Sequence, residues 1–306
     1  MQTLRSAVLA YTASHATSDG LAATPLPGLR MMCVHAPSGP LHSVYRPLVC
    51  LILQGAKQLT VGGEVRQVQA GESVVVTADV PVTGRIVRAS AAEPYCAVAV
   101  EFDQGLLAEL CAELPAPPAP RGGSQVHVEL ADAAVLDCAA RLVQLLDRPE
   151  AAHLLHPGIS RELHYWLLAG RHGEVLRGMA APGGHARRLG EALRLLRSEY
   201  RTDLPVEQLA AAARMSLTAF HRHFKALTSL TPLQFQKQLR LVEARRLMRD
   251  QGLAASTAAF EVGYQSVPQF TRDYARMFGA PPMRDTRAVL ERAKRPALSA
   301  ATPGRS

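Results

Sequence analysis

A short pattern occurs twice in the C-terminal third of this 306-residue chain. Four positions of the first copy recur 50 residues later as the same or a similar amino acid: a serine, a phenylalanine, an arginine and a second aromatic residue. The pairs are Ser216 with Ser266, Phe220 with Phe270, Arg222 with Arg272, and Phe224 with Tyr274; Pro232 and Pro282 keep the same spacing. A repeat at a fixed offset indicates a duplicated supersecondary unit, which restricts how this part of the chain can fold.

Each copy predicts a short helix, a tight turn and a second helix. Ser216 and Ser266 are suited to cap the second helix, because a serine oxygen can accept an N–H group that the helix leaves unbonded. The two aromatic residues that follow are four positions apart, which puts both on one buried helix face. This is the plan of the helix-turn-helix, whose second helix enters the major groove of DNA. We expect the two units at about residues 206–227 and 254–278.

The segment between the two copies predicts one long helix. Thr231 is a suitable cap, and Pro232 at the first helical position loses only an N–H that would be unbonded anyway. A helix from here to Asp250 has about 18 residues and is roughly 27 Å long. That length suits a rigid spacer between two recognition helices that lie about one DNA turn, roughly 34 Å, apart.

Residues 187–287 resemble the DNA-binding domain of the AraC/XylS family of bacterial transcription regulators. Besides the repeat, the resemblance rests on Leu209-Ala210, Lys225, Arg240-Leu241, Ala244, Leu247, Ala259, Gly263-Tyr264 and Phe278-Gly279. Ser229 departs from the family pattern, which usually has glycine after the first recognition helix. Pro268 is a second departure, although proline is tolerated in the first turn of a helix.

The resemblance implies which side chains contact DNA. The residues that correspond to base readers are Thr218, His221 and Arg222 in the first recognition helix, and Val267, Gln269, Thr271 and Arg272 in the second. Arginine can bind guanine, and glutamine adenine, through two hydrogen bonds. His223 and Lys225 are predicted to contact phosphates. For both arginines the sequence leaves an alternative open, in which they contact only phosphate or pair within the domain.

The excess positive charge lies in the same part of the chain. Of 34 Lys and Arg and 26 Asp and Glu, residues from 187 onward contain 21 and 10, a net charge of +11. The preceding residues contain the remaining 13 and 16, a net charge of −3. A merely soluble surface does not explain this asymmetry, whereas a basic domain attracts the phosphate backbone. The charge therefore supports double-stranded DNA as a partner.

The N-terminal part predicts strands. Leu48–Leu53 is an uninterrupted apolar run, and Gly62-Gly63 is a hairpin signal between two further runs. Several short strands at such spacing favour a sandwich or barrel. Gln54-Gly55-Ala-Lys57, with Gly71-Glu72 and the segment 81–84, resembles the cupin-like sensor domain of one AraC-type subgroup. The predicted fold class is therefore α+β with two domains: an N-terminal cupin-like β-barrel with flanking helices, and a C-terminal all-α double helix-turn-helix.

The expected domain organisation follows from these patterns. We expect a sensor and dimerisation domain at residues 1–178, a linker at 179–186, the DNA-binding domain at 187–295 and a disordered tail at 296–306. Helices are predicted at 3–16, 103–114, 131–146 and 157–176. The last two helices are expected to form a dimer contact, the alternative being that they only cover the barrel.

Two chemical alternatives concern the N-terminal part. Cupin barrels often hold a metal, which needs converging histidines and a carboxylate, but only His35 and His42 lie in the strand region. We therefore predict no metal, no cofactor and no enzyme activity; the rival reading is a cupin-type metalloenzyme fused to a DNA-binding domain. An alkyl-transfer repair protein would need a cluster of cysteines ahead of the helix-turn-helix part, and the sequence has none.

The cysteines leave a second possibility for sensing. Five cysteines without a Cys-x-x-Cys pair argue against a disulfide framework and a zinc knuckle. Cys33, Cys50 and Cys96 lie in or beside apolar strands, where cysteines are usually small buried hydrophobic residues. They are the candidate sensor thiols, but reactivity requires access and a lowered pKa.

The sequence thus predicts a DNA-binding transcription regulator whose N-terminal domain responds to an unidentified small effector or to thiol modification. The chain shows no signal peptide and no run of 18 apolar residues, so we expect a cytoplasmic protein. A second copy of the chain and RNA polymerase are the further expected partners.

Overall fold

The computed structural model describes residues 1–17, 19–61, 64–114, 125–180 and 185–286. The predicted turn at Gly62-Gly63, the middle of the predicted linker and the predicted tail at 296–306 lie outside these residues. The described residues form two compact units. One comprises Met1–Glu199 with Leu204–Gln238, and the other comprises Tyr200–Asp203 with the chain from Leu239 onward. This division falls within one long helix, and the predicted domain bounds stay a prediction.

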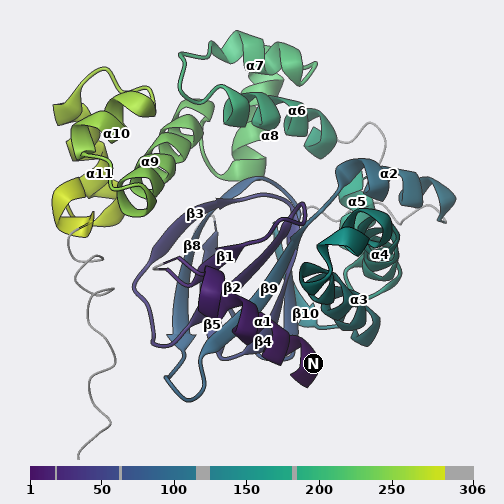
Figure 1. The fold of residues 1–306 in the computed structure, drawn as a ribbon. Helices are drawn as coiled ribbons and strands as arrows, with labels where there is room; N and C mark the ends of the chain where they lie inside the picture. The colour runs from purple at the N-terminus through teal and green to yellow at the C-terminus, as the bar shows by residue number, and fades with distance from the viewer. Residues whose placement is uncertain (18, 62–63, 115–124, 181–184, 287–306) are drawn as a thin grey trace, which may run out of the picture. The chain divides into compact units, whose positions relative to one another are not determined.

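Two antiparallel sheets form the centre of the first unit (Figure 1). The larger has the strand order β1-β2-β9-β4-β7-β10 and the smaller β3-β8-β5-β6. The bounds are Leu21–Ala23 (β1), Leu29–Val34 (β2), Leu41–Tyr45 (β3), Leu48–Gln54 (β4), Ala56–Val61 (β5), Glu64–Gln69 (β6), Glu72–Val76 (β7), Val80–Arg88 (β8), Tyr95–Glu101 (β9) and Val126–Leu130 (β10). The predicted N-terminal β-structure is confirmed, whereas its closer likeness to a cupin stays a prediction.

The apolar run in β4 is explained by burial of both faces of the larger sheet. Alternate side chains of a strand point to opposite faces. Leu48, Cys50 and Ile52 belong to the core between the sheets. Val49 and Leu51 belong to the core on the other face, beneath the helices. A strand with two buried faces needs no polar positions, which accounts for its near-continuous hydrophobicity.

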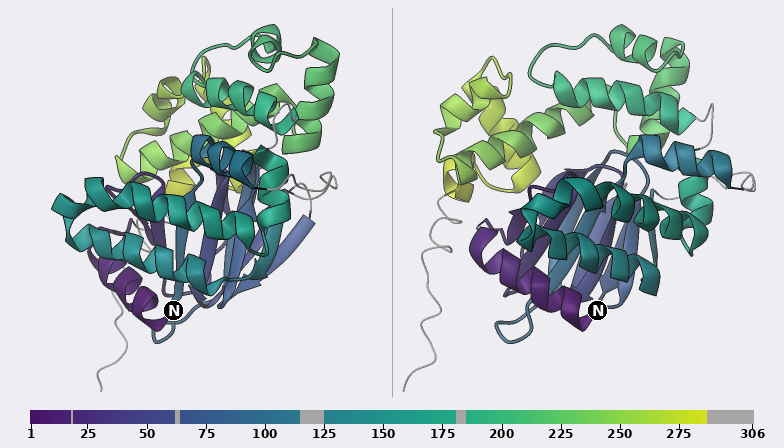
Figure 2. Two further views of the ribbon diagram at one scale, coloured as in Figure 1. Left: turned by 90° about the vertical axis from the view of Figure 1, so that its right-hand side faces the viewer. Right: turned by 45° about the vertical axis from the view of Figure 1, so that its right-hand side comes forward.

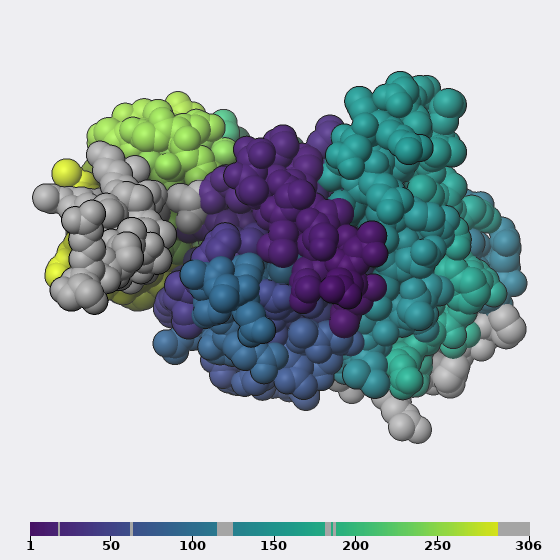
Figure 3. Space-filling view, turned by 60° about the horizontal axis from the view of Figure 1, so that its bottom comes forward, coloured from purple at the N-terminus to yellow at the C-terminus, as the bar shows by residue number. Residues whose placement is uncertain are grey.

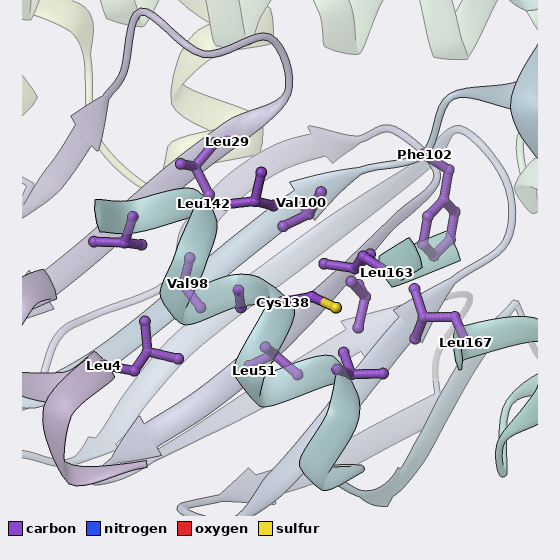
Figure 4. Packing of buried hydrophobic residues seen from close by; sticks show 14 of the residues in the cluster. Leu4, Leu29, Leu51, Val98, Val100, Phe102, Cys138, Leu142, Leu163 and Leu167 are labelled. Atoms are coloured by element: carbon purple, nitrogen blue, oxygen red, sulfur yellow. The ribbon is translucent and has the colours of Figure 1, made fainter. Parts of the chain in front are cut away.

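Five helices of the N-terminal part contribute to the core on the outer face of the larger sheet, and α1, α3 and α4 lie across that face (Figures 2 and 4). They are Gln2–His15 (α1), Gln104–Glu113 (α2), Ala133–Gln144 (α3), Pro149–Ala169 (α4) and Gly173–Ala180 (α5). In Figure 3 the surface of α1 adjoins that of α3 and α4. Figure 4 shows apolar side chains of α1, α3 and α4 meeting those of β4 and β9. No helix of the described residues is long and apolar enough to span a membrane.

The predicted helix at 157–176 is wrong in its bounds. α4 begins eight residues earlier at Pro149, in the first turn, where a proline is tolerated. Pro157 lies inside this helix rather than at its start. The helix ends at Gly170, whose N–H bonds to the carbonyl of Trp166. A second helix begins at Gly173, where the backbone of α4 approaches so closely that a Cβ would collide with the Leu168 carbonyl.

The remaining helices confirm the double helix-turn-helix. They are His185–Ser198 (α6), Val206–Ala212 (α7), Leu217–Thr228 (α8), Pro232–Asp250 (α9), Ala255–Glu261 (α10) and Val267–Phe278 (α11). α7 and α8 form the first pair, in the first unit, and α10 and α11 form the second pair, in the second unit. The predicted spacer is α9.

All three predicted helix caps form. The hydroxyl of Ser216 accepts from the N–H of Ala219 at 3.4 Å, and that of Ser266 from the N–H of Gln269 at 3.5 Å. Thr231 accepts from the N–H of Gln234 at 3.3 Å. The repeated aromatic residues are fully buried, as their spacing predicted. The repeat therefore has one physical basis in both copies: a serine that starts the helix and two aromatic residues that anchor it.

An ion pair fastens α9 to the end of the second unit. The guanidinium of Arg245 donates two hydrogen bonds to the carboxylate of Asp285, at 2.8 and 2.9 Å. The hydroxyl of Tyr274 on α11 donates to the same carboxylate at 2.8 Å. Arg245 also lies over the ring of Phe278, 4.6 Å from its centroid. One carboxylate thus joins α9, α11 and the short helical segment at 282–286.

Candidate nucleic-acid interface and ligand cavity

The first recognition helix, α8, presents a polar face. Phe220 and Phe224 turn inward, so the helix periodicity leaves Thr218, His221 and Arg222 exposed. Lys225, the predicted phosphate contact, is exposed on the same helix. A row of one hydroxyl, one imidazole and two cationic side chains can donate to base edges and to phosphate oxygens.

The second predicted phosphate contact on α8 has a different environment. The ring of His223 is half-buried and stacks on His185 with 3.9 Å between centroids. Arg222 lies 3.3 Å from its Nε2 atom. Burial lowers the pKa of His223, and His185 and Arg222 lower it further. The neutral imidazole is therefore the favoured form of His223, and its predicted contact with phosphate stays a prediction.

The second recognition helix, α11, exposes fewer of its predicted readers. Gln269 and Arg272 are exposed, whereas Val267 and Thr271 are half-buried. Arg276, one turn beyond Arg272, is also exposed and was not among the predicted contacts. The sequence offered the signal for it, because residues four apart share a helix face.

The N-terminal part contains a cavity that sequence reasoning did not locate. Its volume is about 300 Å³, and it lies against the inner faces of both sheets. Much of its wall is apolar, formed by residues such as Met32, Leu48, Ile86, Ala97 and Ala99. Lys57, Cys50 and Tyr95 form a polar patch in this wall. Cys50 and Tyr95 lie on β4 and β9 of the larger sheet and Lys57 on β5 of the smaller sheet, so the packing of the two sheets brings them together.

Lys57 is buried within this patch. Its ammonium donates to the Sγ atom of Cys50 at 3.1 Å. Burial acts to lower the pKa of Lys57, but the interactions with Cys50, Tyr95 and Tyr45 outweigh it, so the pKa is raised. Burial raises the pKa of Tyr95, against the attraction of Lys57. At neutral pH the lysine is therefore a cation and the tyrosine keeps its proton.

The rim of the cavity carries arginines that have carboxylate partners. Glu101 pairs with Arg30 at 2.8 Å and with Arg46 at 3.1 Å. Arg197, in the last turn of α6, pairs with Asp79 and donates to the carbonyl of Tyr45 at 3.2 Å. Burial raises the pKa of Asp79 and lowers that of Arg197, while the attraction between them opposes both shifts.

The candidate sensor thiols occupy two places. Cys50 lies beside Lys57 on the cavity wall, whereas Cys33 and Cys96 are opposite each other on β2 and β9, beneath α1. Burial raises the pKa of Cys33, and it raises that of Cys96 to about 12. Both are thus thiols at neutral pH, a form of low reactivity.

The histidines of the strand region do not converge. Nε2 of His35 lies 3.9 Å from the Sγ atom of Cys33, and Nδ1 of His42 lies 3.2 Å from the hydroxyl of Thr83. Within the described residues, no group of three or more His, Cys, Asp and Glu could hold a metal ion.

Known proteins match both parts of the chain. Residues 25–175 match the family described as the AraC-type transcriptional regulator N-terminus, and residues 209–288 match a helix-turn-helix domain. RhaS of Klebsiella pneumoniae, an HTH-type transcriptional activator, is 32% identical over 100 residues, which are 33% of this chain and 36% of RhaS. GbdR of Pseudomonas aeruginosa, an HTH-type transcriptional regulator, is 28% identical over 105 residues, 34% of this chain and 28% of GbdR. The matches therefore span about a third of each relative's length.

A solved structure resembles most of the chain. It is ToxT from Vibrio cholerae, determined with a bound unsaturated fatty acid. The TM-score is 0.59 over 85% of this chain and 93% of that one, with 8% sequence identity. At this identity the similarity shows the fold alone. In both chains a sheet domain and helix-turn-helix units are part of one polypeptide. With its N-terminal part and its helix-turn-helix part both matched, the chain belongs to the AraC family of transcriptional regulators.

Proposed function

We propose that this protein is a sequence-specific DNA-binding transcription regulator that acts in the cytoplasm under the control of a small effector. The observation that carries the proposal is the paired helix-turn-helix, in which α8 and α11 have the same serine cap and the same aromatic anchors. Arg222 and Arg272 stand at equivalent exposed positions of the two helices. Both helices can therefore place an arginine in a major groove.

The effector is proposed to bind in the cavity between the sheets. A largely apolar cavity of about 300 Å³ with a small polar patch has the character of a small-molecule site. The unsaturated fatty acid bound to ToxT supports a small organic effector for a protein of this fold. Such a ligand would shift the population between arrangements that bind DNA well and poorly.

A second copy of the chain is the proposed partner for α4. Leu154 and Leu155 are 71% and 52% exposed, and Tyr165 and Trp166 are 40% and 37% exposed. Exposed large apolar residues on one helix are typical of an interaction surface. RNA polymerase remains a proposed partner on the strength of family membership alone.

Selection from randomised duplex DNA tests the proposed function. The full-length protein should enrich one motif, and the double variant Arg222→Ala and Arg272→Ala should enrich none. Enrichment of no motif by the unaltered protein, at low salt and with folding verified, would refute sequence-specific binding. Bound metal in the purified protein, together with an activity lost on chelation, would instead favour the rival metalloenzyme.

Sedimentation tests the dimer separately. The full-length protein should associate in the micromolar range, typical of transient interfaces. Leu154→Glu with Leu155→Glu should return it to a monomer, because charges would then lie in the apolar contact. Val65→Glu, which places the same charge at an exposed apolar residue of β6, should leave association unchanged.

A further inference from the structure

The first observation is a buried cation without an anion. Lys57 is 5% exposed, and none of the described residues supplies a carboxylate to it. Its hydrogen-bond partner is the thiol of Cys50, a weak acceptor. Taking an ammonium out of water costs several kcal/mol unless an opposite charge compensates. The protein therefore holds an uncompensated positive charge in the wall of its cavity.

The second observation is an unsatisfied hydroxyl beside that charge. Tyr95 is fully buried, and within the described residues its hydroxyl has no hydrogen bond of acceptable geometry. Lys57 nevertheless lies close enough to affect its ionisation. Buried polar atoms in folded proteins nearly always have a partner. An ammonium and a neighbouring phenol without an acceptor are two donors that one bound acceptor could satisfy.

The third observation excludes the rim as an equivalent anion site. Arg30 and Arg46 also border the cavity, but they share the carboxylate of Glu101 and their side chains are about half exposed to water, while Arg197 is paired with Asp79. An anion that enters the cavity therefore gains most beside Lys57, which is buried and has no carboxylate partner among the described residues. Much of the remaining wall is apolar, so the rest of the molecule is expected to be largely apolar.

We propose that Lys57 and Tyr95 bind the carboxylate of a small monoacid, whose hydrocarbon part fills the cavity between the two sheets. The ammonium compensates the carboxylate charge, and the phenol donates the second hydrogen bond. Cys50 stays next to Lys57 and does not react with the ligand. The proposal rests on the proposed function, since it assigns the effector's chemical class and its anchoring residues.

Calorimetric titration of the full-length protein, without DNA, tests the proposal with decanoate and with decan-1-ol as a neutral match. Decanoate should bind, and Lys57→Met should weaken it about 10- to 100-fold, the range for a lost hydrogen bond to a charged group. Tyr95→Phe should weaken it by about 3- to 10-fold. Neither change should alter decan-1-ol binding by more than about twofold, because the apolar wall is intact.

Two controls keep the outcome decisive. Arg85 also borders the cavity but is exposed, so Arg85→Met should change decanoate binding little. Lys57→Met should fold, and without ligand it should melt no lower than the unaltered protein, because it removes an uncompensated buried charge. Equal decanoate binding by the unaltered protein and Lys57→Met, a larger loss in Arg85→Met, or no decanoate binding at all would overturn the proposal. DNA selection by the same preparations shows independently whether the proposed function holds.

Discussion

Arg222 and Arg272 occupy equivalent positions, but their surroundings differ. Arg222 lies beside His223, and the face around it carries further donors. Arg272 follows a leading turn whose Val267 is apolar and whose Pro268 has no N–H. Both side chains are exposed and able to bind guanine through two hydrogen bonds.

Replacing each arginine by alanine should cost roughly 1–3 kcal/mol of DNA-binding free energy, the value of a bidentate base contact. Each change should relax specificity at one cluster of base pairs, and the two clusters should lie about 10 base pairs apart. Selection of randomised DNA with each variant measures this. If Arg272→Ala lowers affinity without changing the motif, α11 positions the protein on phosphates; if neither changes it, both assignments fail.

Lys225 provides the matched comparison on α8. Because it is assigned to phosphate, Lys225→Ala should weaken binding to every sequence about equally and leave the selected motif intact. The slope of log affinity against log salt should fall by about one unit. A change in the motif would show that Lys225 reads bases.

Asp285 makes the second unit sensitive to acid. Burial alone would raise its pKa, but hydrogen bonds from Arg245 and Tyr274 outweigh this, so the pKa in the folded protein is lowered. A carboxyl whose pKa falls on folding contributes stability above its unfolded pKa, about 3.9, and loses it as pH falls through the folded value.

Asp285→Asn should therefore destabilise the protein by about 1–3 kcal/mol at pH 7, and the difference should shrink below about pH 4. Urea unfolding at several pH values, followed by circular dichroism, checks this. Glu243→Gln serves as the control, because Glu243 forms a more exposed pair with Arg246 and should cost less than about 1 kcal/mol. A constant difference from pH 7 to pH 3 would contradict the assigned linkage.

At the scale of elements, the two recognition helices end alike but with different residues. α8 ends at Ser229 with φ of 62°, and α11 ends at Gly279 with φ of 77°. This left-handed conformation suits glycine and costs other residues roughly 1–2 kcal/mol. The departure from the family pattern at Ser229 is therefore a strained helix end rather than a different turn.

Exchanging these two residues should produce opposite effects. Ser229→Gly should raise the free energy of unfolding by about 1 kcal/mol, and Gly279→Ser should lower it by a similar amount. A Cβ at Gly279 would meet no atom within 4 Å, so the second effect reports backbone conformation alone. Urea unfolding of the two variants measures both, and a destabilised Ser229→Gly would contradict the strain.

Local patterns predicted some elements and missed others for identifiable reasons. The caps at Ser216 and Ser266 were predictable because capping involves residues within one turn. The start of α4 was missed because Pro157 was interpreted as a first-turn residue, although the tertiary contacts of Leu163 and Leu167 keep the helix intact around it. Propensity is a weak guide wherever packing of this kind decides.

At the scale of the whole molecule, the two candidate sites differ in how far the sequence predicts them. The recognition helices follow from residues near one another in sequence, so their exposed faces could be predicted. The cavity combines Cys50, Lys57 and Tyr95 from three strands, and only the pairing of β4 with β9 brings the first and last together. The excess positive charge of the C-terminal part, in contrast, could be counted from the sequence without knowledge of the fold.

That charge distribution gives a prediction for the whole chain. Residues 185–295 alone and the full-length protein should lose DNA affinity with salt at similar slopes, because the N-terminal part has a net charge of −3 and should release no DNA counterions. Binding titrations of both forms at several salt concentrations measure the slopes. A slope that is much steeper for the full-length protein, at protein concentrations where it is a monomer, would show phosphate contacts outside the helix-turn-helix part.

Arg197 is part of both helix α6 and the wall of the cavity. It closes α6, the helix that precedes the first helix-turn-helix, and its guanidinium forms part of the cavity wall while bound to Asp79 and to the carbonyl of Tyr45. A molecule in the cavity therefore shares its boundary with the helix that leads to α8. An effector bound in this cavity would then contact α6 directly through Arg197, with no intermediate residues between the cavity and the helix that precedes the first helix-turn-helix.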